Sequence, residues 1–208
     1  AAAVERGELA PGDRLPPQRR VAEALGVDLT TVTRAYAQAR AMGVLLRKIT
    51  GFSGLVHENM YRFTGWRFLI IGRSLERAMA MASSIAWLAR HDAPEGALDL
   101  AVEIGDSVMS HRRRYAVSTT RDTVVDLLAL DIMNPRSILY QLTELRDQAA
   151  FLPGAEVNGQ LSQLSRAVLR THTALAVETP GTLDEVSLPA LRLRIGDLSE
   201  LLSQAYLR

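Results

Sequence analysis

The sequence predicts an all-α protein: a short helix-turn-helix segment with an incomplete wing over residues 1–50, then a bundle of about six helices over residues 51–208. Two observations carry this prediction. Apolar residues recur at helical spacing along most of the chain, and an apolar–polar alternation with period two is nowhere sustained. Glycine and proline then divide the chain into segments of helical length.

Composition limits the classes of protein to consider. Hydrophobic residues make up 48% and charged residues 23% of the 208 residues, as in an ordinary soluble globular protein. No apolar run approaches the ~20 residues that cross a bilayer, so we expect no membrane partner. Cysteine is absent, which excludes disulfides and thiolate chemistry and fits a cytoplasmic location.

Two short helices are expected in the first segment. Pro16-Pro17 can open a helix, and Gly26 ends it. Asp28 suits the N-cap of the next helix, Leu29–Met42, because its side chain can accept a hydrogen bond from an amide of the first turn. Residues 46–51 then read as the first strand of a β-hairpin wing, but no second strand follows.

Residues that could touch DNA gather at the start of the second helix. Its outer side carries small hydroxyl residues and an arginine, namely Thr30, Thr31, Thr33 and Arg34. Amides and hydroxyls at a helix N-terminus can hold phosphate, and arginine can read guanine. Residues 1–50 carry eight basic and five acidic side chains, which weakly favours a polyanionic partner. By pattern alone, a plain helical hairpin is the favoured alternative.

The specific residue order of this segment favours the DNA-binding interpretation. GELAPGDRLPPQRRVA (residues 7–22) and LGVDLTTVTRAY (residues 25–36) closely resemble the winged helix-turn-helix of GntR-type transcription regulators. The resemblance implies DNA contacts from Arg19 and from Thr30, Thr31, Thr33 and Arg34. The chain departs from that pattern in its shorter first helix and in its missing second wing strand.

The rest of the chain is predicted to form helices. The expected spans are 66–90, 95–115, 120–131, 134–150, 155–178 and a last helix to the C-terminus that Pro189 and Gly196 interrupt or kink. Asn134-Pro135 is interpreted as an N-cap followed by proline at the first helical position. Arg136 is expected to pair with a carboxylate such as Asp131.

Several stretches of this part resemble the alpha-E family, a bacterial all-helical domain named for a Glu-Arg pair. They are LVHENMYR (55–62), GWRFL (65–69), GRSLERA (72–78), DSVMSHRRRY (106–115) and NPRSILYQL (134–142). The resemblance covers most of residues 52–208, corresponds to the C-terminal half of the family's length, and places the Glu-Arg pair at Glu76-Arg77. It implies an ATP-grasp or transglutaminase-like protein as partner. The change of resemblance near Arg47–Phe52 fits a natural fusion, an assembly error or an artificial chimera.

Arg73, Glu76 and Arg77 lie three and four positions apart and therefore share one helical face. The functional interpretation is an anion or nucleotide site, and the structural alternative, which the pattern favours, is an ion-pair network that links two helices. Arg112-Arg113-Arg114 could bind phosphate, but adjacent residues point in different directions around a helix, so a solvated face is the simpler interpretation.

Motifs for catalysis are lacking. The four histidines form no i, i+4 pair of the zinc-helix type, and no Gly-rich phosphate loop is present. Lys48 is the only lysine. It lies where the resemblance to GntR-type regulators gives way to the resemblance to the alpha-E family, which argues against a pyridoxal-phosphate Schiff base. We therefore expect no enzyme activity, no metal and no cofactor.

Two functions from different classes follow. The first is a DNA-binding transcriptional regulator whose helical part binds a partner or a ligand. The alternative is an alpha-E interaction module of a peptide-ligase or peptide-modification system, with a non-functional N-terminal segment. The apolar runs of residues 66–71 and 124–130 go nearly all round their helices, so we also expect an exposed apolar patch there and a homodimer.

Overall fold

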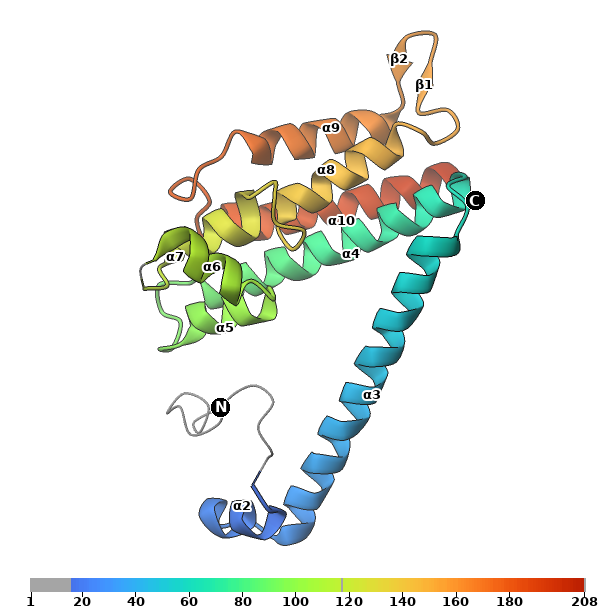
Figure 1. Ribbon diagram of the computed structural model, residues 1–208. Coiled ribbons are helices and arrows are strands. Elements are labelled where there is room, and N and C mark those ends of the chain that lie inside the picture. The colour runs from blue at the N-terminus through green and yellow to red at the C-terminus, as the bar shows by residue number, and fades with distance from the viewer. Residues whose placement is uncertain (1–15, 117, 208) are drawn as a thin grey trace. The chain divides into compact units, whose positions relative to one another are not determined.

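The computed structural model describes residues 16–116 and 118–207 of the chain (Figure 1). Residues 1–15, which begin the predicted helix-turn-helix segment, lie outside this description. The chain divides into two compact units, Ala1–Met60 and Tyr61–Arg208. The division falls ten residues after the boundary that the sequence suggests, because a single helix runs across that boundary.

The first unit is built on two helices, α2 (Gln18–Leu25) and α3 (Leu29–Asn59). Gly26 ends α2 in the left-handed conformation (φ 63°), where glycine carries no steric penalty. Asp28 caps α3 as predicted: its side chain accepts a hydrogen bond from the Thr30 amide at 2.7 Å. The apolar contact between the helices is small, because only Ala22 and Val32 are buried among the hydrophobic residues described here.

The predicted wing strand is wrong, because α3 continues without interruption through residues 46–51. Leu45, Leu46, Arg47 and Lys48 are good helix formers, and no proline occurs between residues 29 and 59. The Thr50 hydroxyl also donates to the Leu46 carbonyl at 2.8 Å, four residues back along the helix. The described part of this unit therefore contains no strand.

The second unit is a bundle of four long helices, α4 (Thr64–Leu88), α8 (Ile138–Ala149), α9 (Gln163–Ala176) and α10 (Ser187–Tyr206). Helix α4 packs on α8 and α10, and α9 packs on the same two helices (Figure 1). Buried residues of α4 recur every three or four positions, from Ile71 through Leu75, Ala78 and Ala82 to Ile85. This periodicity gives the all-α architecture that the sequence predicts.

Short helices close one end of the bundle, where α5 (Ala97–Ile104), α6 (Val108–Tyr115) and α7 (Arg121–Val125) lie together (Figure 1). A π-helix, Asp126–Leu130, continues α7. The single helix predicted over residues 95–115 is divided at Gly105-Asp106. A Cβ at Gly105 would lie 2.5 Å from Leu128, and Asp106 has a positive φ of 48°. Close packing on the π-helix thus divides α5 from α6.

A β-hairpin occupies residues where helix was predicted. Strands β1 (Glu156–Val157) and β2 (Gln160–Leu161) pair in antiparallel fashion across Asn158-Gly159, and both turn residues have positive φ. Asn-Gly is the strongest short hairpin signal in a sequence, so this feature was detectable. The last helix, α10, runs through Pro189 and Gly196; proline is tolerated there because the first turn needs no amide donor.

The exposed apolar patch lies elsewhere than predicted. Trp66, Ile71 and the apolar residues between 124 and 129 are buried in the bundle. The exposed large apolar side chains instead concentrate on α3: Met42, Val44, Leu45, Leu46, Ile49, Phe52 and Leu55. None of the helices described is both long and apolar enough to cross a membrane.

Candidate functional site

The residues proposed to touch DNA all lie on the surface of the first unit. Arg19, Thr30, Thr31, Thr33 and Arg34 are exposed. Two of the hydroxyls, however, already have partners within the unit. The Thr30 hydroxyl donates to the Asp28 carboxylate, and the Thr33 hydroxyl bonds to the Gln18 side chain at 2.8 Å.

Asp28 also changes the electrostatics of this helix end. Hydrogen bonds from the Thr30 hydroxyl and amide lower the pKa of the Asp28 carboxyl, which keeps it ionised. A carboxylate therefore sits at the N-terminus of α3, where a DNA phosphate would otherwise bind. The positive charge available to DNA therefore comes from the exposed arginines, chiefly Arg19 and Arg34.

The Glu-Arg pair belongs to a different arrangement in the second unit. Arg73 and Arg77 lie one turn apart on α4, and α8 packs along the same helix. Burial lowers the pKa of the Arg77 guanidinium, and the positive charges of Arg73 and then Arg136 lower it further, while Tyr140 acts in the opposite direction. Arg73 and Arg77 on α4 and Arg136, which precedes the α8 that packs on α4, are called here the arginine cluster.

Glu76 does not neutralise the arginine cluster. Its side chain is exposed, and among the residues that the structure describes no ion pair joins it to Arg73 or Arg77. The expected network of a carboxylate between two guanidiniums is therefore not formed. One carboxylate does reach the cluster: Asp106 Oδ2 lies 2.8 Å from Arg136 Nη2. The predicted partner of Arg136, Asp131, is engaged elsewhere.

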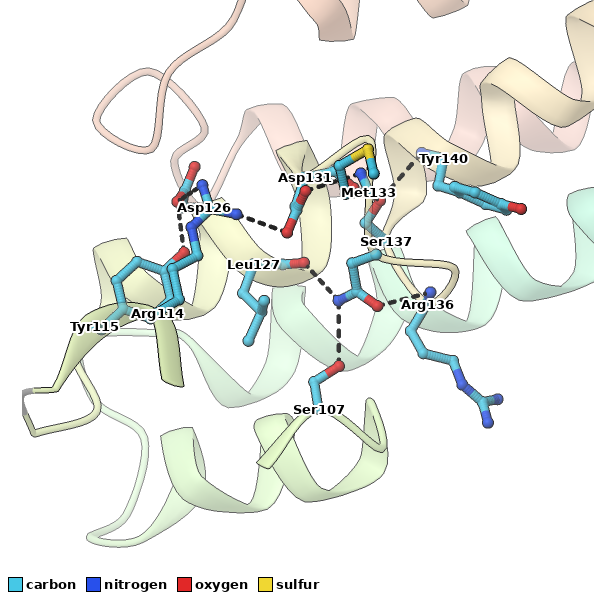
Figure 2. A network of polar contacts seen from close by, with 11 residues as sticks. Ser107, Arg114, Tyr115, Asp126, Leu127, Asp131, Met133, Arg136, Ser137 and Tyr140 are labelled. Atoms are coloured by element: carbon cyan, nitrogen blue, oxygen red, sulfur yellow. Dashed lines mark hydrogen bonds and ion pairs between the residues drawn. The ribbon is translucent and has the colours of Figure 1, made fainter. Parts of the chain in front are cut away.

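A buried asparagine fixes the backbone that carries Arg136 (Figure 2). The Asn134 amide donates to the Leu127 carbonyl at 2.9 Å and to Ser107 Oγ at 3.2 Å. Its Oδ1 accepts from the Arg136 amide at 3.0 Å. Asn134 therefore ties the start of the α8 region to the π-helix and to the α5–α6 turn. Its predicted capping role belongs to Ser137, whose hydroxyl accepts from the Tyr140 amide.

Arg114 is satisfied within the fold, unlike the arginine cluster. It bridges Asp131 at 2.6 Å and Asp126 at 2.9 Å (Figure 2). Asp126 also accepts from the Tyr115 hydroxyl, and burial followed by this contact raises the pKa of Tyr115. Arg112, Arg113 and Arg114 are all exposed, as the interpretation of a solvated face expects, and Arg114 in addition joins α6 to the π-helix.

Within residues 16–116 and 118–207, no group of three or more acidic or histidine side chains is placed to hold a metal ion. The arginine cluster has the opposite character. Arg77 and Arg136 are exposed, Arg73 is half-buried, and all three can donate hydrogen bonds to an anion.

Comparison with known proteins identifies the chain. A family described as a predicted α-helical domain with a conserved ER motif, alpha-E, matches residues 18–207. The protein belongs to the alpha-E family. The match begins at Gln18 and so includes α2 and α3, which the sequence had assigned to a GntR-type regulator. DNA binding therefore rests only on that resemblance and on exposed basic residues.

Relatives of this alpha-E protein occur in mycobacteria. Uncharacterized proteins of Mycobacterium bovis and of two Mycobacterium tuberculosis strains are each 33% identical over 168 residues. The aligned region covers 79% of this chain and 18% of each relative, so the chain spans about a fifth of their length. No solved structure matches the chain significantly.

Sequence reasoning located two members of the arginine cluster and missed its third. Arg73 and Arg77 followed from helical spacing, whereas Arg136 is 59 residues from Arg77 and comes from another element. The available signal was Asn134-Pro135, although the helix begins three residues later than it indicated, at Ile138 after the Ser137 N-cap. It did not reveal that this start lies beside α4.

Proposed function

We propose that this alpha-E domain is a non-enzymatic binding module that holds an anionic group of its partner at the arginine cluster. One observation supports the proposal: Arg73 and Arg77 lie one turn apart on α4, Arg136 precedes the α8 that packs on α4, and Asp106 is the single carboxylate that forms an ion pair with any of the three in the described chain. Gathering like charges is unfavourable, and a bound anion would relieve the repulsion.

The partner is taken from the family resemblance. We propose an ATP-grasp or transglutaminase-like protein, which would present the anionic group to the arginine cluster. The exposure of Arg77 and Arg136 supports a contact with a second molecule, because both side chains can be reached without opening the bundle core. Surface charges are well screened, so such a contact should weaken as salt is added.

Titration of the whole chain with small anions tests this function. Inorganic sulfate, followed by calorimetry at low ionic strength, is expected to bind wild type and to lose at least tenfold in affinity with Arg77→Gln. The matched control is Arg113→Gln, which removes an exposed arginine of α6 outside the cluster. Equal sulfate binding by the two variants, or none by wild type, would count against the module.

DNA binding by α2 and α3 is a second candidate. The observation that favours it is the exposure of Arg19, Thr31 and Arg34 beside the α2–α3 turn. Double-stranded DNA should then bind wild type more tightly than Arg19→Ala/Arg34→Ala, with an affinity that falls steeply as salt rises. Affinity independent of salt, or unchanged in the double variant, would rule this surface out.

A further inference from the structure

We infer that the outer faces of α5 and α6 bind the same faces of a second copy of the chain, with α5 of each copy against α6 of the other. The two copies are then related by a two-fold axis, and every contact between them occurs twice. The pairing involves none of Arg73, Arg77 and Arg136, so it goes beyond the proposed anion site and does not depend on it.

Helix α5 has an outer face that is both apolar and acidic. Its inner face is buried at Ala101 and Val102. On the opposite side Leu100 and Ile104 are about half exposed, and Glu103 is exposed between them. Residues three and four apart on a helix are neighbours, so these three side chains form one patch. Both charged residues of α5 are acidic.

Helix α6 has an outer face of the opposite charge. Its buried residue is His111, whereas Met109 is 76% exposed and Arg112 and Arg113 are exposed too. The two arginines follow Met109 by three and four positions and therefore flank it on the helix surface. No acidic residue occurs in α6. One helix thus offers a carboxylate beside apolar side chains, and the next offers guanidiniums beside an apolar side chain.

The same element lies beneath both helices at this end of the bundle (Figure 1). Helix α5 packs on α7, and His111 Nε2 of α6 lies 3.0 Å from Thr123 Oγ1 of α7. The turn that joins α5 to α6 is fixed as well, because the Asn134 amide donates to the buried Ser107 hydroxyl at 3.2 Å. The outer faces of α5 and α6 therefore point away from a shared support and are held in a fixed relation to each other.

The opposite charges of the two faces do not meet within one chain. In the part of the chain that the structure describes, no ion pair joins Glu103 to Arg112 or Arg113. A second copy related by the two-fold axis brings Glu103 to these arginines and the apolar side chains of α5 to Met109. Burial of the apolar side chains drives the contact, and the charges fix its orientation, because exposed ion pairs contribute little energy. Two short helices make a small interface, so the dimer is weak.

Charge reversal tests this pairing in a way that a folding defect cannot imitate. Glu103→Arg and Arg112→Glu/Arg113→Glu each place like charges opposite one another, so either variant alone should dimerise about tenfold more weakly. Mixed in equal amounts, the two variants present opposite charges at both contacts and should associate as tightly as the unreversed chain. Sedimentation velocity over a range of concentrations measures this. All chains carry Phe52→Glu, which removes an exposed apolar side chain from α3 and with it association through that helix.

Two further variants complete the experiment. Ile104→Glu should also weaken the dimer about tenfold, because it places a charge in the apolar contact. Glu156→Arg reverses an exposed carboxylate on β1, outside both helices, and should have no effect. Circular dichroism confirms that each variant is folded.

Three results would overturn the inference. The first is a Phe52→Glu chain that stays monomeric up to about 1 mM. The second is dimerisation of either charge variant as tight as that of the unreversed chain. The third is a mixture of the two charge variants that associates no better than each does alone, since only contact between α5 of one copy and α6 of another predicts the recovery.

Discussion

Two long helices of this protein, α3 and α4, contain many apolar residues and use them in opposite ways. The 25 residues of α4 include eight that are buried, whereas Val32 is the only buried residue among the 31 of α3. Helix α4 packs on α8 and α10, so its apolar side chains lie in the bundle core. An apolar helix is thus buried only where the fold supplies neighbours.

The two helices also differ in what stabilises them. Helix α4 gains stability from tertiary packing, which supplies most helical stability in proteins. Helix α3 depends more on its own hydrogen bonds, and it contains Gly43, Gly51 and Gly54, each costing about 1 kcal/mol relative to alanine. A Cβ at Gly51 or Gly54 would meet nothing within 4 Å. Substitutions in the two regions should therefore differ strongly in their effect.

The largest expected effect follows from a cavity in the bundle. Leu142 on α8 is fully buried, so Leu142→Ala should lower the free energy of unfolding by about 2–5 kcal/mol. Ile49→Ala on α3 removes a side chain that is 52% exposed and should change stability by about 0.5 kcal/mol or less. Urea unfolding followed by circular dichroism measures both. Similar losses would mean that α3 is packed as tightly as the core.

A second contrast compares two asparagines. Asn134→Ala leaves the Leu127 carbonyl and the Arg136 amide without a buried partner and should cost about 1–3 kcal/mol. Asn59→Ala on α3 removes one exposed bond, to the Leu55 carbonyl, and should be nearly neutral. Thermal unfolding of the two variants provides the comparison. A stable Asn134→Ala protein would show that other groups position the α8 region.

Local signals in the sequence predicted well where a residue acts on its own neighbours. Asp28 caps α3, Gly26 ends α2, and Thr120 begins α7, because each interaction lies within three residues. The predicted wing strand was wrong because it followed the resemblance to GntR-type regulators, although residues 45–48 favour a helix. Asn158-Gly159 was overlooked although it carries a clear turn signal.

Distant contacts could not be predicted in the same way. The α5–α6 break depends on Leu128 lying against Gly105, and the arginine cluster depends on α8 lying beside α4. Neither neighbour is visible in the local pattern. Asn134 was predicted as an N-cap, a role that Ser137 has, and its partners Ser107 and Leu127 come from other elements.

Self-association is the next expected effect and concerns α3 directly. Met42, Leu45, Ile49, Phe52 and Val56 follow the three–four spacing of a coiled-coil seam, and the first four are at least half exposed. We expect two copies of the chain to pair through this seam. Phe52→Glu should shift the protein toward monomer in sedimentation velocity, whereas Leu193→Glu, an exposed position on α10, should not. A wild type that stays monomeric at high concentration would contradict the homodimer.

The smallest expected effect is a pH dependence within the bundle. Burial lowers the pKa of His172 below its ordinary value of 6.5, and the positive charge of Arg146 lowers it further, while Asp147 partly opposes them. The Nε2 atom of the ring lies 3.1 Å from Thr143 Oγ1 and 3.4 Å from Arg146 Nη1. As pH falls through about 6.5, the unfolded chain takes up a proton at this site before the folded chain does, so stability declines toward the folded pKa.

His172→Gln should flatten this decline in urea unfolding measured between neutral and mildly acidic pH. His91→Gln gives a control of opposite sign, because the Glu185 contact raises the pKa of His91. The His91 contribution is present below about pH 6.5 and disappears as pH rises through the folded pKa, so removing it should lower stability on the acidic side. The effect is small because the His91–Glu185 pair lies at the surface. Parallel pH curves for wild type and His172→Gln would show that α8 and α9 accommodate a charged ring at this position.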